Sequence, residues 1–167
     1  SPKISSSVET KEEKPSGAKE QALSEMMNRI KETPESAIKL KLSIQMPTNK
    51  GGLYLKLSQQ KKILHETEII WEETSPAWKE FQIAFQEIDM KHPMKLVCWA
   101  KEEKGQKTSD FLGMAMIEIS DLFQFQSNSS LPLCNRFNAP LKDMMLFFRG
   151  IEITPKRLSA VSNNVDL

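Results

Sequence analysis

The sequence has few of the residues on which secreted, catalytic or metal-binding domains depend. Its 167 residues include two cysteines and two histidines. Cys98 and Cys134 could form at most one disulfide, and their spacing matches no zinc or redox motif. We therefore expect two reduced, structural thiols, which favours a cytoplasmic setting. Because His65 and His92 lie in no recognisable nucleophile motif and no glycine-rich phosphate loop occurs, neither an enzyme nor a cofactor is predicted.

Long apolar runs and a large net charge are also absent. Hydrophobic residues make up 39% and charged residues 27%, with a formal net charge of +1. This balance argues against a nucleic-acid binder. No apolar run approaches the ~20 residues that cross a bilayer, and the N-terminus lacks the basic-then-apolar pattern of a signal peptide. The length fits one domain with a single core.

The ends of the chain are predicted to lie outside this core. Residues 1–36 are rich in Ser, Lys and Glu and have no aromatic residue, which predicts a flexible leader. A short helix is predicted within it, over residues 18–31, from four apolar side chains at helical spacing. These are Leu23, Met26, Met27 and Ile30. The helix could pack on the domain or bind a partner. Residues 156–167 are predicted to form a flexible tail.

From Ile38 onward the hydrophobic period changes to two. Apolar residues alternate with Lys, Ser and Gln over residues 38–46, which predicts a half-buried strand. Seven further segments are predicted strands, namely LYLKL, ILHETEIIW, FQIAF, MKLVCWA, FLGMAMIEI, RFNAPL and MLFFRGIEITP. Turn residues separate them, with no helical pattern between most of them. An all-β fold, an eight-stranded antiparallel β-sandwich over residues 37–155, is therefore predicted.

The order of these segments resembles the C2 domain family of calcium- and lipid-binding β-sandwiches. TSPAWKEFQIAF resembles the family's Asn-Pro-x-Trp-x-x-x-Phe-x-Phe segment, with Ser75 in place of Asn. SDFLGMAMIEISDL resembles its Asp-Phe-Leu-Gly strand. The resemblance covers residues 37–155 and implies a Greek-key topology.

The resemblance also implies where a calcium site would lie. Two loops of calcium-binding members supply about five carboxylates, since calcium takes 6–8 oxygen ligands. Here the loop QMPTNKGG has no acidic residue, and none occurs from Ile38 to His65. In the other loop Ala100 replaces an expected ligand, and Glu102 and Asp110 remain as a weak remnant. We therefore predict no metal site, and expect Asp110 to accept backbone hydrogen bonds in a turn.

Lysines are frequent in the acid-free segment. The candidate lipid-binding residues are Lys39, Lys41, Lys56, Lys61 and Lys62. Those at 39, 41 and 56 point away from the apolar faces of their strands, so they would form one basic patch if the strands are neighbours. The resemblance implies that such patches bind phosphoinositides, and each lysine near an anionic membrane contributes on the order of 1 kcal/mol. Alternatively, these lysines keep the sheet soluble and prevent its edge strands from pairing with other chains.

The sequence thus predicts a non-enzymatic, calcium-independent module that binds anionic phosphoinositide membranes peripherally. Trp71 and Trp99 could assist if they are partly exposed, although packing in the sandwich is the favoured interpretation of Trp71. The alternative is a protein-interaction or scaffolding domain that kept the fold without binding lipid or calcium. The terminal residues Val165, Asp166 and Leu167 resemble a ligand of PDZ domains, which makes a PDZ domain a further candidate partner.

Overall fold

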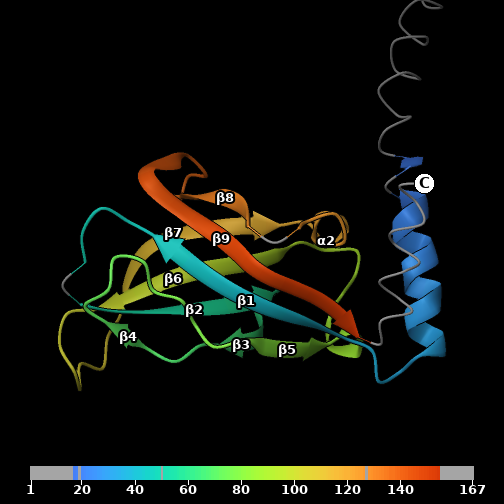
Figure 1. Ribbon diagram of the computed structural model, residues 1–167, viewed down its shortest axis with the longest axis horizontal. Helices are drawn as coiled ribbons and strands as arrows, with labels where there is room; N and C mark the ends of the chain where they lie inside the picture. Colours follow the sequence, from blue (N-terminus) through green and yellow to red (C-terminus); the bar gives the residue numbers. More distant parts are fainter. Residues whose placement is uncertain (1–16, 19, 50, 127, 155–167) are drawn as a thin grey trace, which may run out of the picture.

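The computed structural model describes residues 17–18, 20–49, 51–126 and 128–154 (Figure 1). Residues 20–32 are helical. The strands that follow are β1 (Ala37–Gln45), β2 (Gly52–Gln59), β3 (Lys62–Glu66), β4 (Ile70–Trp71), β5 (Phe81–Ala84), β6 (Met94–Lys101), β7 (Asp110–Ile117), β8 (Ser129–Cys134) and β9 (Pro140–Thr154). A 3-10 turn, η1 (Phe85–Glu87), follows β5, and a short helix, α2 (Ile119–Leu122), follows β7.

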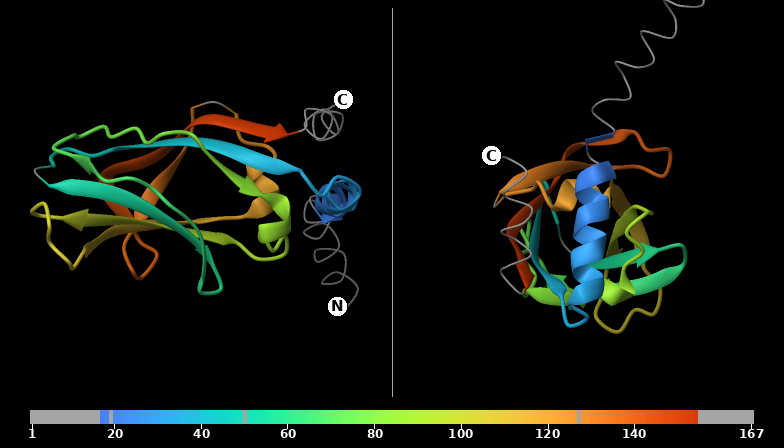
Figure 2. Two further views of the ribbon diagram at one scale, coloured as in Figure 1. Left: turned by 90° about the horizontal axis from the view of Figure 1, so that it is seen from below. Right: turned by 90° about the vertical axis from the view of Figure 1, so that its right-hand side faces the viewer.

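The strands form two antiparallel layers. Their order is β3-β2-β6-β7-β8-β9-β1-β5, with β4 paired to β2. β7 and β8 share a single residue pair, Met114 with Cys134, and the sheet folds over at this point. Layers β3-β2-β6-β7 and β8-β9-β1-β5 therefore face each other across the core (Figure 2). The predicted antiparallel β-sandwich is confirmed.

A glycine allows the fold-over between the layers. A Cβ atom at Gly113 of β7 would lie 3.0 Å from the Leu141 side chain and 3.2 Å from Leu133. These distances are tighter than most real Cβ contacts. The missing side chain therefore lets β8 and β9 pass close over β7.

The alternation that predicted the strands also builds the core. β1 buries Ile38, Leu40, Leu42 and Ile44, and β2 in the opposite layer buries Leu53, Leu55 and Leu57. Each fully buried aliphatic side chain of this size stabilises the fold by roughly 1.5–3 kcal/mol. Trp78, which precedes β5, is buried as well, and its backbone N–H donates to the carbonyl of Leu42.

Two predicted strands have different bounds. The segment ILHETEIIW is divided into β3 and β4 by Thr67, whose hydroxyl accepts the N–H of Leu55 at 2.8 Å. The segment RFNAPL is mostly a turn, and β8 begins earlier, at Ser129. Asn135 causes this turn because its side-chain oxygen accepts two backbone N–H groups within residues 135–139.

The helix at residues 20–32 lies across the end of the sandwich opposite the β6–β7 loop (Figures 1 and 2). Met26 is 2% exposed and belongs to the core. The other predicted apolar positions, Leu23, Met27 and Ile30, are partly buried against it. Of the two alternatives for this helix, these contacts favour packing on the domain over binding a partner. None of the described helices is long and apolar enough to cross a bilayer.

His65 and Phe81 close one side of the sandwich. They belong to β3 and β5, the edge strands of the two layers, and their rings stack with centroids 3.9 Å apart and planes at 7°. Burial lowers the pKa of the His65 imidazole from its usual value, and the carboxylates of Glu68 and Glu66 oppose this shift to a smaller extent. The stack therefore favours the neutral ring.

We expect mild acid to destabilise the domain through His65. Its pKa is lower in the folded than in the unfolded chain, so its contribution to stability is complete above about pH 6.5 and is lost as the pH falls below that value. Urea unfolding from about pH 8 to about pH 5.5 measures this loss. His65→Phe keeps a stacked ring without a titrating group and should show a flatter dependence. Equal slopes for the two proteins would contradict the assignment.

Candidate functional site

The lysines expected to form one patch lie on two different layers. Lys39 and Lys41 belong to β1, which pairs with β9 and β5, whereas Lys56 belongs to β2, which pairs with β3, β4 and β6. The two layers face each other through the core, so outward side chains on β1 and β2 point to opposite faces of the molecule. The strands are not neighbours, and the patch expected from the sequence is not one surface.

Lys61 and Lys62 lie at the turn between β2 and β3. Gln60 and Lys61 have φ values of 45° and 72°, the positive angles that a two-residue hairpin turn requires. The Lys62 ammonium bonds the carboxylate of Glu87 at 2.6 Å and lowers the pKa of that carboxyl. Lys61 remains exposed and has no carboxylate partner among the described residues.

A different set of cations shares the outer face of β2, β6 and β7. The register places its side chains in three rows across the strands, namely Tyr54–Trp99–Phe111, Lys56–Val97–Met114 and Ser58–Lys95–Met116. We refer to these nine residues, together with Lys101 at the end of β6, as the β2–β6–β7 face. Lys56 and Lys95 are diagonal neighbours on adjacent strands, about 7–8 Å apart between their Cα atoms.

Aromatic rings occupy one end of the β2–β6–β7 face. Trp99 meets Phe111 edge to face, with centroids 6.1 Å apart. The guanidinium of Arg136 lies 4.1 Å from the Phe111 centroid, a cation–π geometry. The Tyr54 hydroxyl bonds the Ser109 hydroxyl at 2.7 Å. The indole N–H of Trp99 is buried and has no acceptor among the described residues, an unusual state for an indole on a sheet face.

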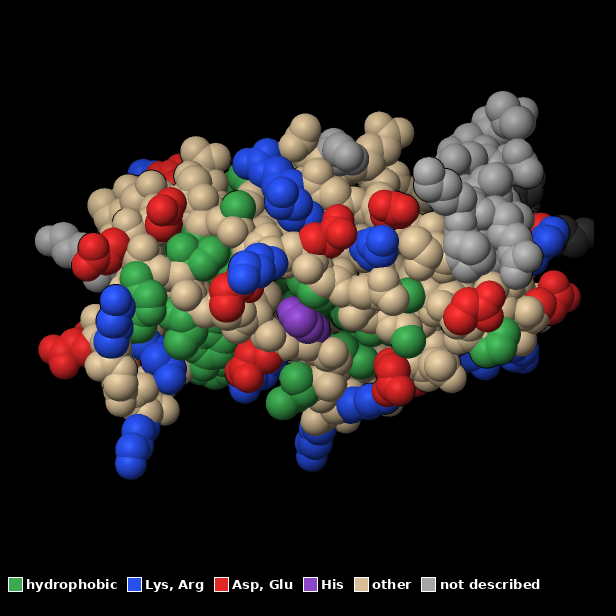
Figure 3. Space-filling view, turned by 60° about the horizontal axis from the view of Figure 1, so that its bottom comes forward, with side chains coloured by type: hydrophobic (Ala, Val, Ile, Leu, Met, Phe, Trp, Pro, Cys, Tyr) green, Lys and Arg blue, Asp and Glu red, His purple; other side chains and the backbone are tan. Residues whose placement is uncertain are grey.

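The charges on this face are mostly positive. Lys56 lies 3.5 Å from Glu66, but both side chains are partly exposed, so this ion pair contributes little. Lys95 is exposed, and the Lys101 ammonium donates to the carbonyl of Gln106 at 3.0 Å. The side that bears β3 and β5 differs, because there positive and negative side chains are interspersed (Figure 3).

The β6–β7 loop is held together by one side chain. The Gln106 carbonyl oxygen accepts the backbone N–H groups of Glu102 and Glu103 at 3.1 and 3.3 Å. Its amide nitrogen donates to the carbonyl of Thr108 at 2.8 Å. A protein amide thus closes the loop in which the family resemblance would place calcium ligands.

The remnant acidic residues do not form a site. Asp110 is exposed at the start of β7, opposite Ala100 on β6, and its carboxylate bonds none of the described residues. The expected turn role of Asp110 is therefore wrong, and Gln106 has that role instead. Glu102 is also exposed. In the described part of the chain, no three His, Cys, Asp or Glu side chains come together as metal ligands would.

The β1–β2 loop closes onto the end of β6. A Cβ atom at Gly51 would overlap the carbonyl oxygen of Lys101, so no larger side chain fits there. Asn49 fixes this approach, because its side chain accepts the N–H of Gly51 at 3.0 Å and donates to the carbonyl of Glu73 at 2.9 Å. The backbone of the β1–β2 loop therefore lies directly against the backbone at the end of β6.

The sequence analysis missed Lys95, Lys101 and Arg136. For the first two a signal was present, since they share strand parity with Trp99, which was expected to be partly exposed. No such signal was present for Arg136, because the segment RFNAPL is a predicted strand and its alternation does not reveal the turn. Residues 155–167, with the possible PDZ ligand, lie outside the described residues.

Comparisons with known proteins agree on the fold. The C2 domain family matches residues 29–133, and this family is generally non-enzymatic. No curated protein sequence matches the chain. The solved structure named BON1-C2B superposes with a TM-score of 0.57 at 20% identity, covering 72% of this chain and 93% of that one.

A second solved structure is described as "CC2D1B coordinates ESRCT-III activity during the mitotic reformation of the nuclear envelope". It superposes with a TM-score of 0.50 at 13% identity, covering 78% of this chain and 61% of that one. At such identities the likeness shows the fold alone.

We expect Gln106→Ala to loosen the β6–β7 loop. The N–H groups of Glu102 and Glu103 lose their acceptor, so their amide hydrogens should exchange faster with solvent. The free energy of unfolding should fall by about 1 kcal/mol or less, because water can replace the lost bonds at this exposed loop. The control is Lys107→Ala, an exposed neighbour that should leave exchange at both amides unchanged. Unaltered exchange in Gln106→Ala would show that the side chain does not hold the loop.

Proposed function

The chain belongs to the C2 domain family, and we propose that it acts as a non-enzymatic module that binds anionic membranes peripherally and without calcium. The β2–β6–β7 face carries this proposal. It places Lys56 and Lys95 beside each other, with Tyr54 and Trp99 next to Lys56. Lysines attract anionic headgroups, and aromatic side chains with a polar end are favoured at membrane–water interfaces.

The expected affinity is modest and sensitive to salt. Each lysine near an anionic surface contributes about 1 kcal/mol, and this attraction is screened within a Debye length. Lys56 is partly compensated by Glu66, whereas Lys61 and Lys95 are exposed without a carboxylate partner among the described residues. Clustered phosphates, as in phosphoinositide headgroups, suit such a small cluster of point charges.

Two features support binding without calcium. Both lie at the end of the domain that bears the β1–β2 and β6–β7 loops, which we call the loop end. The β6–β7 loop is closed by Gln106, and Gly51 brings the β1–β2 loop against the carbonyl of Lys101. Both contacts are internal to the protein. Calcium needs a cluster of oxygen ligands, whereas the β1–β2 loop has no acidic residue and those of the β6–β7 loop are interspersed with lysines.

Both cysteines are free thiols, and this supports a reducing, cytoplasmic setting for the domain. Cys98 is buried in β6, and burial raises the pKa of its thiol to about 12. Such a thiol is inert at neutral pH. Cys134 ends β8 and is half-buried.

Protein binding is the second candidate function, and the same face favours it through different residues. Met116 is 46% exposed and Ile63 on β3 is 57% exposed. Exposed apolar side chains, and Met in particular, are typical of protein interfaces. A partner that binds equally well after charge reversal of the lysines would favour this second function.

Vesicle co-sedimentation tests the membrane proposal. The wild-type protein should pellet with phosphatidylcholine vesicles that contain phosphatidylinositol 4,5-bisphosphate, less so at high salt, and equally with calcium or chelator. Lys56→Glu combined with Lys95→Glu should weaken binding more than tenfold, because each reversal replaces an attraction of about 1 kcal/mol by a repulsion.

The matched control is Lys39→Glu combined with Lys41→Glu, which changes the same charge on the opposite layer and should bind like wild type. Thermal unfolding of both double variants checks that each is folded. Absence of pelleting at low salt, or an equal loss in both double variants, would overturn the proposal.

A further inference from the structure

The turn between β8 and β9 presents an almost fully exposed aromatic ring. Phe137 is 91% exposed, more than the other large exposed apolar side chains, Ile63, Met116 and Ile69. Single exposed apolar residues are common on protein surfaces, so exposure alone assigns no role. Two further observations concern the shape of the turn and the charges around it.

The turn holds the ring on a fixed backbone. The side-chain oxygen of Asn135 accepts the N–H groups of Phe137 and Ala139 at 2.8 and 3.0 Å. The backbone N–H of Asn135 donates to the carbonyl of Ala139 at 2.8 Å, and Asn138 supplies the positive φ, 65°, that the reversal needs. Binding through a preorganised turn loses little conformational entropy.

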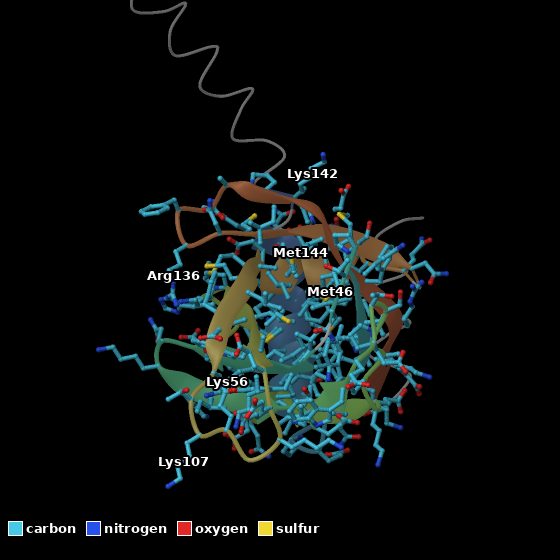
Figure 4. All side chains as sticks on the ribbon, turned by 90° about the vertical axis from the view of Figure 1, so that its left-hand side faces the viewer. Met46, Lys56, Lys107, Arg136, Lys142 and Met144 are labelled. Carbon is cyan, nitrogen blue, oxygen red and sulfur yellow. The ribbon has the colours of Figure 1, made fainter. Side chains whose placement is uncertain are left out.

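The charged side chains of the β8–β9 turn and of the segments that flank it, residues 122–142, are positive. Residues 122–142 contain no Asp or Glu, and their charged side chains are Arg136 and Lys142. In a view onto the end that bears the β6–β7 loop, Arg136 lies on the same side as Lys56 and Lys107, and Lys142 lies at the top of the molecule (Figure 4). Because the Arg136 guanidinium lies over Phe111, the turn is anchored to the β2–β6–β7 face. A surface that meets this face therefore also meets the turn.

We propose that the β8–β9 turn, residues 135–139, is a membrane anchor. Phe137 enters the interfacial region of an anionic bilayer, while Arg136 and Lys142 contact lipid phosphates. This inference rests on the proposed function and adds an orientation. The loop end and the β2–β6–β7 face are directed to the bilayer, and the helix at residues 20–32 lies at the end away from it.

A bilayer fits this turn better than a protein pocket does. Specific protein interfaces bury on the order of 1,200–2,000 Å², whereas the turn offers one ring between the polar side chains of Asn135 and Asn138. A bilayer interface needs no matching pocket. Binding at such an interface combines burial of a few apolar side chains with attraction between basic residues and anionic lipids. The turn offers an apolar ring and neighbouring basic side chains.

Tryptophan fluorescence of Phe137→Trp tests the insertion. Vesicles of phosphatidylcholine and phosphatidylserine should shift the emission of the added indole to shorter wavelength, and lipids with a quencher near the headgroup should reduce it. The signals of Trp71, Trp78 and Trp99 are removed by subtracting the wild-type protein. Gln124→Trp is the matched control, an exposed position just after α2, at the end opposite the loops, and its emission should not change.

Co-sedimentation of Phe137→Ala separates this inference from the proposed function. Its binding should be about tenfold weaker, since it loses the transfer of one ring from water, and its dependence on salt should be unchanged because no charge is removed. Its thermal unfolding should match wild type, because the side chain is exposed.

If wild type pellets, equal pelleting of Phe137→Ala with no emission shift in Phe137→Trp would overturn the anchor and leave the proposed function standing. If wild type pellets neither with phosphatidylinositol 4,5-bisphosphate vesicles nor with phosphatidylserine vesicles, the anchor and the proposed function are both overturned. An emission shift as large with vesicles of phosphatidylcholine alone would contradict the role given to Arg136 and Lys142.

Discussion

The antiparallel register of β2 against β6 is the constraint on which the rest of this structure depends. It turns Leu55, Leu57 and Leu96 into the core and, on the same strands, turns Lys56 and Lys95 outward. A shift of one residue would exchange the two faces completely. The burial that stabilises the sandwich therefore also determines which side chains form the basic face. A shift in the register of these two strands would therefore alter stability and candidate function together.

Much of the fold could be predicted because a period of two reports directly which side chains are buried. The same pattern does not report which strands are neighbours, and for this reason Lys39 and Lys41 were grouped with Lys56 although they lie on opposite layers. The alternation along β6 would have placed Lys95 and Lys101 on the same outward face as Trp99. The role of Gln106 could not be predicted, because its three bonds depend on the path of the whole loop. Likewise, the turn at Asn135 could not be predicted, because the apolar residues of RFNAPL alternate as they would in a strand.

The loop end differs physically from one that is assembled by an ion. Contacts within the chain hold it together, with the Gln106 amide inside one loop and the Gly51 backbone against the other. We propose that a surface assembled in this way keeps its shape whether or not calcium is present. Under the proposed function, control over binding would therefore come from the lipid composition of the membrane and from ionic strength, not from an ion signal.

Gly113 connects the interior of the sheet to the proposed anchor. Its missing side chain sets how closely Leu133 and Leu141, which flank the β8–β9 turn in sequence, approach β7. That approach places Arg136 over Phe111 and fixes the height of the turn above the sheet. A larger residue at this position would act as a wedge under the hairpin and tilt the Phe137 ring relative to the lysines. Under the proposed anchor, the angle at which the domain meets a membrane would therefore depend on the missing side chain of Gly113.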